Sequence, residues 1–457
     1  MSQPTQSLAG LLASAPTPVQ ALRAVHYPPL YSLPGLTQEF TNWRDEQNSW
    51  HTTAALLNQS YHMVNLYVQG PDALRLFSDL GANSFKNFAV GVAKQFIALN
   101  EEGYLLGDAI LAYLDTDSFD LMGEPGIISW VQFHIETGDY NVSYEREDNS
   151  IVRPGDAKEY RYEIQGPAAL DIIEAATGKP VPATKFFHIE EFTIAGHRVR
   201  GIRHGMAGQA GYELFGPWAE REAVHDALLA AGEKFGMKQA GSISYFTSHL
   251  EGGWFGRPVP AWFSGESTRA FREWAPARVA KSLGGSFDSD VIEDYYLTPF
   301  DLDYGRFTTD DHDYVGRDAA LALRDKPAKK KVALIWDDVD FADVFGGLVR
   351  PEQGAPPQFL DIGVSGRYSF YQYDAVRAGG KTIGFTGHNA YVSPERRFVA
   401  LATIDAEFAE PGTEVEQVWG DSLKLPRAQV ENHRQVPVRA VVAPTPFGAF
   451  AREKYRK

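Results

Sequence analysis

The chain has 457 residues, of which 44% are hydrophobic and 22% charged, a balance typical of a globular protein with two to three domains. Its formal net charge of −16 disfavours nucleic acids and anionic membranes as partners, because both are bound through positively charged surfaces. The absence of cysteine excludes disulfides, thiolate catalysis and cysteine-ligated metal sites, and it fits a reducing compartment.

The N-terminal segment is rich in alanine, serine, threonine, proline and glutamine. It lacks the positive charge and the long apolar core of a signal peptide. No apolar stretch of the sequence is long enough to span a bilayer. We therefore expect a soluble, cytoplasmic protein whose first helix begins near residue 21.

Three segments share one pattern, in which a short strand runs into Gly-Pro and then into a helix. The strands are expected at residues 63–69, 160–165 and 212–215, and the helices that follow them are expected to end near residues 79, 176 and 235. Residues 103–114 are apolar with interspersed glycine, which predicts a strand pair or hairpin. These elements predict an α+β body with related substructures.

The pattern of predicted elements changes after residue 332, where short strands are separated by Gly, Pro and Asn turns with little helix between them. The strands are expected at residues 332–336, 381–386, 398–404, 413–419 and 436–442. This pattern predicts a C-terminal β-barrel or sandwich domain. The Lys-rich stretch at 325–331 is interpreted as a solvated linker, which divides the chain into residues 1–325 and 332–457.

Four motifs follow one another along the chain: NEEGYLLGDAILAYL at residues 100–114, RHGMAGQAGYELFGP at 203–217, DYVGRDAAL at 313–321 and GFTGHNAYVSPERRFVALATI at 384–404. In this order they resemble the segments of the glycine-cleavage aminomethyltransferase (T-protein) superfamily. The resemblance implies a three-domain cloverleaf of two interwoven α+β domains and a C-terminal β-barrel. It also implies that tetrahydrofolate binds in the central channel.

Other segments, among them EFTNWRDEQ at residues 39–47, QSYHMVNLYVQG at 59–70 and GSISYFTSHLEGGW at 241–254, are similar to the aryl O-demethylase branch of the superfamily. That branch includes vanillate and syringate O-demethylases. The resemblance implies a methyltransferase that passes the O-methyl group of a small, lignin-derived methoxylated aromatic acid to tetrahydrofolate. It does not fix the oligomeric state.

An aryl methyl ether is inert because phenoxide is a poor leaving group, so its cleavage needs an aligned nucleophile and a proton for the departing oxygen. Tyrosine suits the acid role because its pKa of about 10 is close to that of the phenol formed. The resemblance assigns this role to Tyr245. It also places His62 in the substrate pocket, where a histidine can hydrogen-bond the phenol or relay its proton. Asp108 lies in an apolar strand, and by resemblance it orients or activates the folate amine.

Three residues are expected to bind the folate by resemblance. Glu213 in Gly-Tyr-Glu-Leu corresponds to the pterin-binding acid of the superfamily, and a carboxylate can accept two hydrogen bonds from the pterin. Gln165 ends a strand before Gly-Pro and is expected to contact the folate. Trp254 is expected to stack on the folate or on the aryl ring.

The substrate-binding residues are less well defined by the sequence. Tyr27 and Tyr31 compete for one branch tyrosine in the N-terminal segment, and Tyr61 is a further pocket candidate beside His62. Neighbouring strand residues point to opposite faces, so Tyr61 and His62 cannot both reach the substrate directly.

One departure from the branch concerns the substrate carboxylate. Vanillate-type relatives carry an arginine in the segment after the Asp108 hairpin, whereas this chain has Glu124 there. This departure favours syringate over vanillate as substrate. Arg203 and Arg257 are candidates for the replacement cation.

No metal is expected, because the 12 histidines form neither a His-x-x-x-His nor a His-x-His pair. Two other functions compete with O-demethylation. One is an aminomethyltransferase-type enzyme acting on another donor, and the other is a non-catalytic folate-binding module. The segment around Tyr245 and the presence of Asp108 disfavour both.

Overall fold

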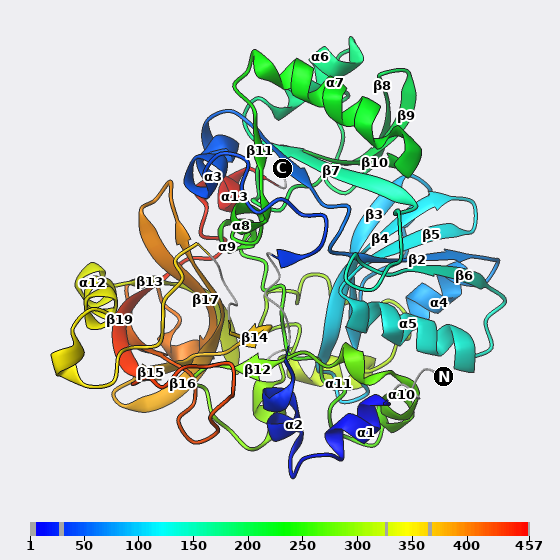
Figure 1. Cartoon of the computed structure of the whole chain (residues 1–457). Helices are drawn as coiled ribbons and strands as arrows, with labels where there is room; N and C mark the ends of the chain where they lie inside the picture. Colours follow the sequence, from blue (N-terminus) through cyan, green and yellow to red (C-terminus); the bar gives the residue numbers. More distant parts are fainter. Residues whose placement is uncertain (1–5, 27–31, 325–327, 364–367, 456–457) are drawn as a thin grey trace.

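The computed structural model describes residues 6–26, 32–324, 328–363 and 368–455. Figure 1 shows two sheets with their helices and a barrel, arranged around a common centre. The predicted α+β class and the C-terminal β-barrel are confirmed, and the barrel is closed. The division at residues 325–332 stays a prediction. No helix in the described ranges has both the length and the apolar character needed to cross a membrane.

The first sheet has six strands in the order β11-β1-β7-β10-β9-β8. It is built from β1 (Ala55–Asn58), β7 (Glu159–Gln165), β8 (Ile189–Ile194), β9 (His197–Ile202), β10 (Gly211–Pro217) and β11 (Lys238–Ala240). Helices α6 (Ala169–Thr177) and α7 (Arg221–Glu233) cover its outer face (Figure 1). Helix α3 (Trp43–Thr52) leads into β1.

The second sheet has five strands in the order β3-β4-β5-β2-β6. Its strands are β2 (Val64–Gln69), β3 (Val92–Leu99), β4 (Leu105–Asp115), β5 (Ser118–Gly123) and β6 (Ser143–Glu147). Helices α4 (Ala73–Leu80) and α5 (Pro125–Thr137) pack on it through one large apolar core. The chain thus contributes β1 to the first sheet, builds the second sheet, and then returns to the first, so the two sheets are interwoven.

The barrel closes in the order β13-β17-β16-β15-β18-β19. Its strands are β13 (Lys329–Trp336), β15 (Ala375–Ala378), β16 (Lys381–Val392), β17 (Arg397–Asp405), β18 (Glu414–Trp419) and β19 (Val436–Ala443), with α12 (Asp338–Gly347) between β13 and β15. A separate apolar core fills it, built largely from alternate strand residues. All five predicted strands are present, and the short β15 was not foreseen.

Shorter elements connect these units and complete the chain. At the N-terminus lie α1 (Leu8–Leu12) and α2 (Pro18–Ala24). The helices α8 (Ser242–Tyr245), α9 (Ser248–Gly252), α10 (Arg269–Trp274) and α11 (Arg317–Leu323) cross between the sheets and the barrel, together with the small strand pair β12 (Leu283–Gly284) and β14 (Tyr371–Gln372). The final helix α13 (Ala449–Glu453) brings the C-terminus back beside α8 and α9 (Figure 1).

The three predicted strand–Gly-Pro–helix units are present as β2–α4, β7–α6 and β10–α7. In the first two, Gly70 and Gly166 have φ values of +146° and +133°. A Cβ at Gly70 would lie 2.4 Å from the backbone oxygen of Asn141, so that turn has room only for glycine.

Two sequence-based interpretations were wrong. Residues 103–114 do not form a strand pair, because almost all of them lie in the single strand β4, and the turns fall outside it near Gly103 and Asp117. The lysine run is not a solvated linker either. Lys329 to Lys331 begin β13, and Lys331 points inward with 8% of its surface exposed.

Candidate active site

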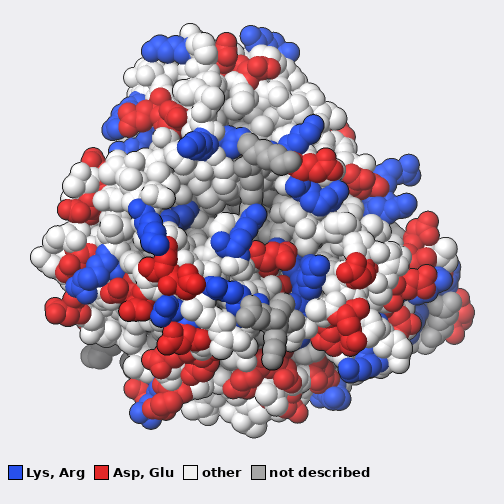
Figure 2. Space-filling model, turned by 180° about the vertical axis from the view of Figure 1, so that it is seen from behind, with Lys and Arg blue, Asp and Glu red and all other residues white. Residues whose placement is uncertain are grey.

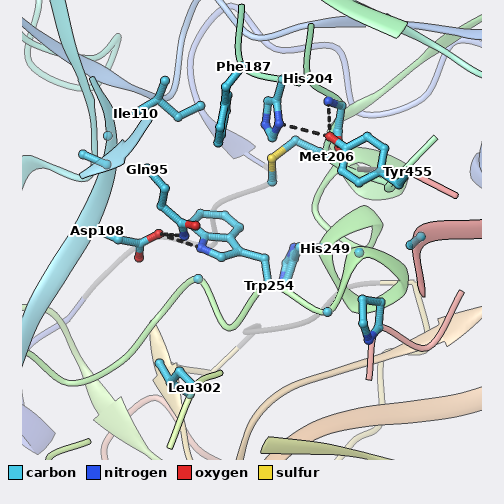
Figure 3. A pocket seen from close by; sticks show the side chains of 18 of the residues that line it. Gln95, Asp108, Ile110, Phe187, His204, Met206, His249, Trp254, Leu302 and Tyr455 are labelled. Atoms are coloured by element: carbon cyan, nitrogen blue, oxygen red, sulfur yellow. Dashed lines mark hydrogen bonds between the residues drawn. The ribbon is translucent and has the colours of Figure 1, made fainter. Parts of the chain in front are cut away.

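A cavity of about 440 Å³ lies where the two sheets, the α8–α9 segment, the start of β13 and the C-terminal segment meet. Figure 3 shows its side chains, among them Asp108, Phe187, His204, Trp254 and Tyr455. The volume is within the range of small-molecule sites. The cavity brings together predicted site residues that are far apart in the sequence, namely His62, Asp108, Glu213, Tyr245 and Trp254.

The acidic wall of the cavity follows from strand alternation in β7 and β10. In β7, Tyr160, Tyr162 and Ile164 face the helix-covered core, which turns the intervening Arg161, Glu163 and Gln165 toward the centre of the molecule. In β10 the same alternation turns Glu213 inward, directly across from Glu163. This register sets two carboxylates side by side.

Glu213 is held by a buried arginine. Its Oε1 accepts a hydrogen bond of 2.6 Å from Nη1 of Arg161, and Arg161 also contacts Asp120 at 3.3 Å. All three side chains are almost fully buried. The arginine supplies the opposite charge that lets carboxylates remain here without water.

Tyr245 and His62 form a second polar pair at the cavity. The Tyr245 hydroxyl lies 3.0 Å from Nε2 of His62, while the other ring nitrogen of His62 is buried without a partner among the described residues. Burial lowers the pKa of His62 to about 3. Burial, reinforced by nearby carboxylates, raises the pKa of Tyr245 well above its usual value. Both side chains are therefore neutral, and the tyrosine keeps its proton.

Asp108 is the centre of a third polar group. Its Oδ2 accepts hydrogen bonds from Gln95 Nε2 at 2.6 Å and from Trp254 Nε1 at 2.9 Å, and the Tyr304 hydroxyl lies 3.4 Å away. Figure 3 shows the other carboxylate oxygen turned away from these donors. Burial raises the pKa of Asp108, and the hydrogen bonds oppose that shift. One oxygen thus anchors the side chain, and the other has no hydrogen bond from the described residues.

Known proteins that are similar to this chain identify its family. The sequence matches the GCVT N-terminal domain family over residues 13–256. It is also 43% identical, over 427 residues and 92% of both chains, to a syringate O-demethylase from Sphingobium sp. (strain NBRC 103272 / SYK-6). The chain belongs to the GCVT family.

Other comparisons agree with this assignment. A sesamin methylene transferase from Sinomonas sp. (strain No.22) is 28% identical over 77% of this chain and 78% of its own. The crystal structure of the glycine cleavage system aminomethyltransferase T from Bartonella henselae covers 93% of this chain and 94% of its own, with a TM-score of 0.62 and 17% identity. The second likeness concerns the fold alone. The predicted resemblance to the superfamily and to its O-demethylase branch is confirmed.

Within this GCVT fold, two predicted contact residues, Gln165 and Tyr61, do not line the cavity. Gln165 lies behind its wall, where Oε1 accepts a hydrogen bond of 3.0 Å from the Ala207 amide and Nε2 has no partner among the described residues. Tyr61 packs edge-on against Trp218, with ring centroids 6.0 Å apart. Tyr27 and Tyr31 lie outside the described residues. Their predicted roles stay predictions.

The negative charge of Glu124, the residue that stands in place of the branch arginine, is offset by two nearby cations. Glu124 lines the cavity at the start of α5, and burial raises its pKa while the charges of Lys281 and Arg257 oppose the shift. Arg257 lines the cavity and is 7% exposed. Arg203, the other candidate cation, is not among the residues that line it.

The sequence did not point to several residues that line the cavity, such as Gln95 and Tyr304, or to Glu163, which lies behind its wall. Glu163 accepts hydrogen bonds from Gln59 and from the Met206 amide, and burial together with the Glu213 charge raises its pKa well above the usual value. Tyr304 and Gln95 support Asp108. The sequence of β7 could have indicated Glu163, because a charged residue that alternates with apolar residues on a strand packed under helices is expected to point into the protein. No group of three metal-ligating side chains occurs in the described ranges.

Proposed function

We propose that the chain is a tetrahydrofolate-dependent O-demethylase that transfers a methyl group from syringate to tetrahydrofolate, with 3-O-methylgallate and 5-methyltetrahydrofolate as products. The observation that carries the proposal is the joint placement of Tyr245, His62, Asp108 and Glu213 on one cavity. The 43% identity to a syringate O-demethylase supports the choice of substrate. The reaction belongs in the cytoplasmic catabolism of lignin-derived aromatics.

The cavity suits a reduced folate. Glu213 offers a buried carboxylate to the amino group and ring N–H of a pterin, and the Arg161 pair keeps this carboxylate in place. Phe187, stacked on His204 with ring centroids 5.1 Å apart, and Trp254 offer flat apolar surfaces. Two buried atoms at the cavity, Oε1 of Gln59 and Nδ1 of His62, have no hydrogen-bond partner in the part of the chain that the structure describes, and a ligand could satisfy them.

Tetrahydrofolate supplies, when bound, the amine that accepts the methyl group. The task of the chain is then to receive the charge that develops on the phenolic oxygen. Tyr245 donates its proton to that oxygen, and His62 fixes the direction of the hydroxyl from 3.0 Å away. Burial raises the pKa of Tyr245, and it also raises the pKa of a phenol bound beside it, so the two acids stay matched and the transfer remains nearly thermoneutral.

Asp108 orients the acceptor amine through the carboxylate oxygen that its three neighbours leave open. The short hydrogen bonds from Gln95 and Trp254 prevent the side chain from rotating. Such a fixed acceptor contributes to the rate because the reactants need not reorganise it during transfer.

Arg257 holds the substrate carboxylate. It lines the cavity close enough to Glu124 for its charge to affect the pKa of that residue. Lys281 also offsets the Glu124 charge. A guanidinium matches a carboxylate geometrically, and this arrangement replaces the arginine that the vanillate-type segment carries.

The test is a turnover assay under anaerobic conditions with purified protein, tetrahydrofolate and syringate. We expect 3-O-methylgallate and 5-methyltetrahydrofolate in equal amounts, and no reaction when the folate is left out. Vanillate and 3-O-methylgallate serve as competing substrates in the same assay. Intact syringate in the complete mixture, or demethylation without folate, would refute the proposal.

A further inference from the structure

Helix α3 lies beside the segment that carries Tyr245 (Figure 1). It begins inside the sequence EFTNWRDEQ at residues 39–47, one of the segments that resemble the O-demethylase branch. None of the residues of α3 lines the cavity. Any contribution of this helix to the reaction must therefore come through the residues that it holds in place.

The carboxylate of Glu46 is completely buried in α3, with 0% of its surface exposed. In contrast, Figure 2 shows acidic side chains spread over the rear face of the molecule, beside lysine and arginine side chains. In the described part of the chain, the hydrogen-bond donors to Glu46 are backbone amides and hydroxyl groups, and no cation forms an ion pair with it. A charge without water is costly unless such bonds are made, so these donors must keep their positions.

The two oxygens of Glu46 bind two separate segments of the chain. Oε1 accepts hydrogen bonds from the amides of Phe40 at 2.7 Å and Thr41 at 2.8 Å. Oε2 accepts from the Gly241 amide at 2.8 Å and lies 3.3 Å from the Ser244 hydroxyl. Gly241 directly precedes α8. One carboxylate thus joins the turn of α8 to the loop that leads into α3.

The α8–α9 segment has two faces with different partners. Tyr245 and His249, four residues apart, line the cavity. Ser244, Thr247 and Glu251 follow one another at helical spacing, and all three form hydrogen bonds with side chains of α3. The same segment therefore presents one side to the cavity and is held from the other side by α3.

The two further contacts from α3 extend this support along the segment. Nε2 of Gln47 donates to the Thr247 hydroxyl at 2.8 Å, and Nε1 of Trp50 donates to Oε1 of Glu251 at 3.1 Å. Gln47 also accepts from the Ser393 amide of the barrel at 2.6 Å. These contacts fix the segment as a whole.

The Glu46 contact is the one nearest to Tyr245. The amide of Tyr245 donates to the Gly241 carbonyl at 3.0 Å, and the Ser244 hydroxyl also lies 3.0 Å from that carbonyl. Gly241 itself is held by Glu46 through its amide. The position of the Tyr245 backbone is thus set through the turn that Glu46 anchors.

We propose that Glu46 is a positioning residue of the methyl transfer, an inference that rests on the proposed function. Its carboxylate holds the turn of α8 in place and thereby sets where the Tyr245 hydroxyl meets the phenolic oxygen. An acid must lie within about 2.6–3.2 Å of the atom that it protonates. Misplacement by about 1 Å is enough to cost about a hundredfold in rate. Glu46 itself touches no reactant and exchanges no proton.

The variant Glu46→Gln tests this placement. An NH₂ group then replaces one of the two acceptor oxygens and faces N–H donors, which should displace the turn. We expect kcat with syringate to fall by about ten- to hundredfold, while KM and the dissociation constant of 5-methyltetrahydrofolate stay within about threefold of wild type. The matched control is Glu39→Gln. Glu39 is exposed and binds the Trp43 amide at 2.9 Å at the start of the same helix, so this variant should keep the wild-type kcat.

A double-variant cycle separates positioning from general damage to the fold. Single-turnover rates of Tyr245→Phe and of Glu46→Gln/Tyr245→Phe should agree within about twofold, because the position of a hydroxyl that is absent no longer matters. Ser244→Ala makes the same comparison with the buried carboxylate retained, since it removes only the 3.3 Å partner of Oε2 and the bond to Gly241. We expect it to lower kcat by about two- to tenfold, and to have no effect in the Tyr245→Phe background.

The outcomes distinguish this inference from the proposed function. A kcat of Glu46→Gln equal to that of wild type would overturn the inference alone. The same fold loss with and without the Tyr245 hydroxyl would also overturn it, because the carboxylate would then support the fold and not the acid. If Glu46→Gln does not fold, Ser244→Ala decides by the same criteria. Syringate left intact by the wild-type protein with tetrahydrofolate would overturn the proposed function and this inference with it.

Discussion

The hydroxyl oxygen of Tyr245 lies 3.0 Å from Nε2 of His62, although the two residues are 183 positions apart in the chain. Tyr245 ends the short helix α8, and His62 lies in the turn between β1 and β2. Their rings meet edge to face, with centroids 5.0 Å apart. The pair places a neutral proton donor at the cavity and fixes its direction.

Replacement of Tyr245 by phenylalanine should remove the acid and keep the ring. We expect turnover with syringate to fall by about 10²- to 10⁴-fold, the range typical of general acid catalysis. Calorimetry should show that 5-methyltetrahydrofolate binds with a dissociation constant within about threefold of wild type. The matched control is Tyr314→Phe, which removes a hydroxyl that bonds the Thr309 carbonyl at 2.9 Å and does not line the cavity. Full activity in Tyr245→Phe would exclude this tyrosine as the acid.

His62 should make stability depend on pH in a defined direction. Its pKa in the folded protein is about 3, below the ordinary 6.5, so below pH 6.5 the unfolded chain takes up a proton that the folded protein refuses. Stability is therefore lost as the pH falls from 6.5 toward 3. Urea unfolding at pH 7 and pH 5 should show about 2 kcal/mol less loss in His62→Gln than in wild type. Equal losses in the two proteins would show that His62 is charged or absent from the buried pair.

The variant Asp108→Asn tests the roles of the two carboxylate oxygens separately. The amide oxygen can still accept from Gln95 and Trp254, while an NH₂ group then replaces the acceptor that faces the cavity. We expect an unchanged melting temperature and a tenfold to hundredfold lower kcat, because one charge-assisted hydrogen bond is lost. Tyr304→Phe removes the 3.4 Å contact to the same oxygen and the 3.0 Å hydrogen bond from Gln95 to the hydroxyl, but it keeps both direct anchors of Asp108 and should have a much smaller effect. A stable Asp108→Asn protein with normal kcat would contradict the role of the open oxygen.

The sequence predicted those parts of the site that lie in regular patterns. Strand alternation and the Gly-Pro turns located β7 and β10, and the superfamily resemblance picked out Glu213, Asp108 and Tyr245. Glu163 was missed because its importance comes from the register that sets it opposite Glu213, and register across a sheet depends on distant residues. Lys331 was misjudged because a run of lysines indicates solvent exposure, whereas strand alternation in β13 turns the third lysine inward, where it donates to the Gly253 and Leu302 carbonyls.

Arg257 should matter only for substrates that carry a carboxylate. Arg257→Gln is expected to raise KM for syringate by about ten- to hundredfold, because it removes a charged hydrogen-bond donor from the cavity. The KM for 2,6-dimethoxyphenol, which has the same ring ethers and no carboxylate, should change little. Parallel increases for both substrates would indicate general damage to the cavity and would argue against a carboxylate contact.

Tyr455 should stabilise the cavity wall from the end of the chain. Its hydroxyl lies 2.5 Å from the Gly205 amide, 2.6 Å from the Gly205 carbonyl and 3.1 Å from Nδ1 of His204 (Figure 3). Phenylalanine at this position leaves the Gly205 amide without its acceptor, which should cost about 1–3 kcal/mol of unfolding free energy. The substitution should loosen the segment that follows Gly205. This segment also binds Glu163 and Gln165, through the amides of Met206 and Ala207.

A looser wall should release the folate faster. Stopped-flow measurement of 5-methyltetrahydrofolate dissociation should therefore show a higher rate for Tyr455→Phe, while Tyr314→Phe, which loses a hydroxyl bonded elsewhere, should dissociate at the wild-type rate. Because the ring of Tyr455 remains in the variant, a faster release would be due to the lost hydrogen bonds and not to an opened gap. Identical dissociation rates with an unchanged unfolding free energy would mean that the C-terminal segment lies against the cavity without closing it.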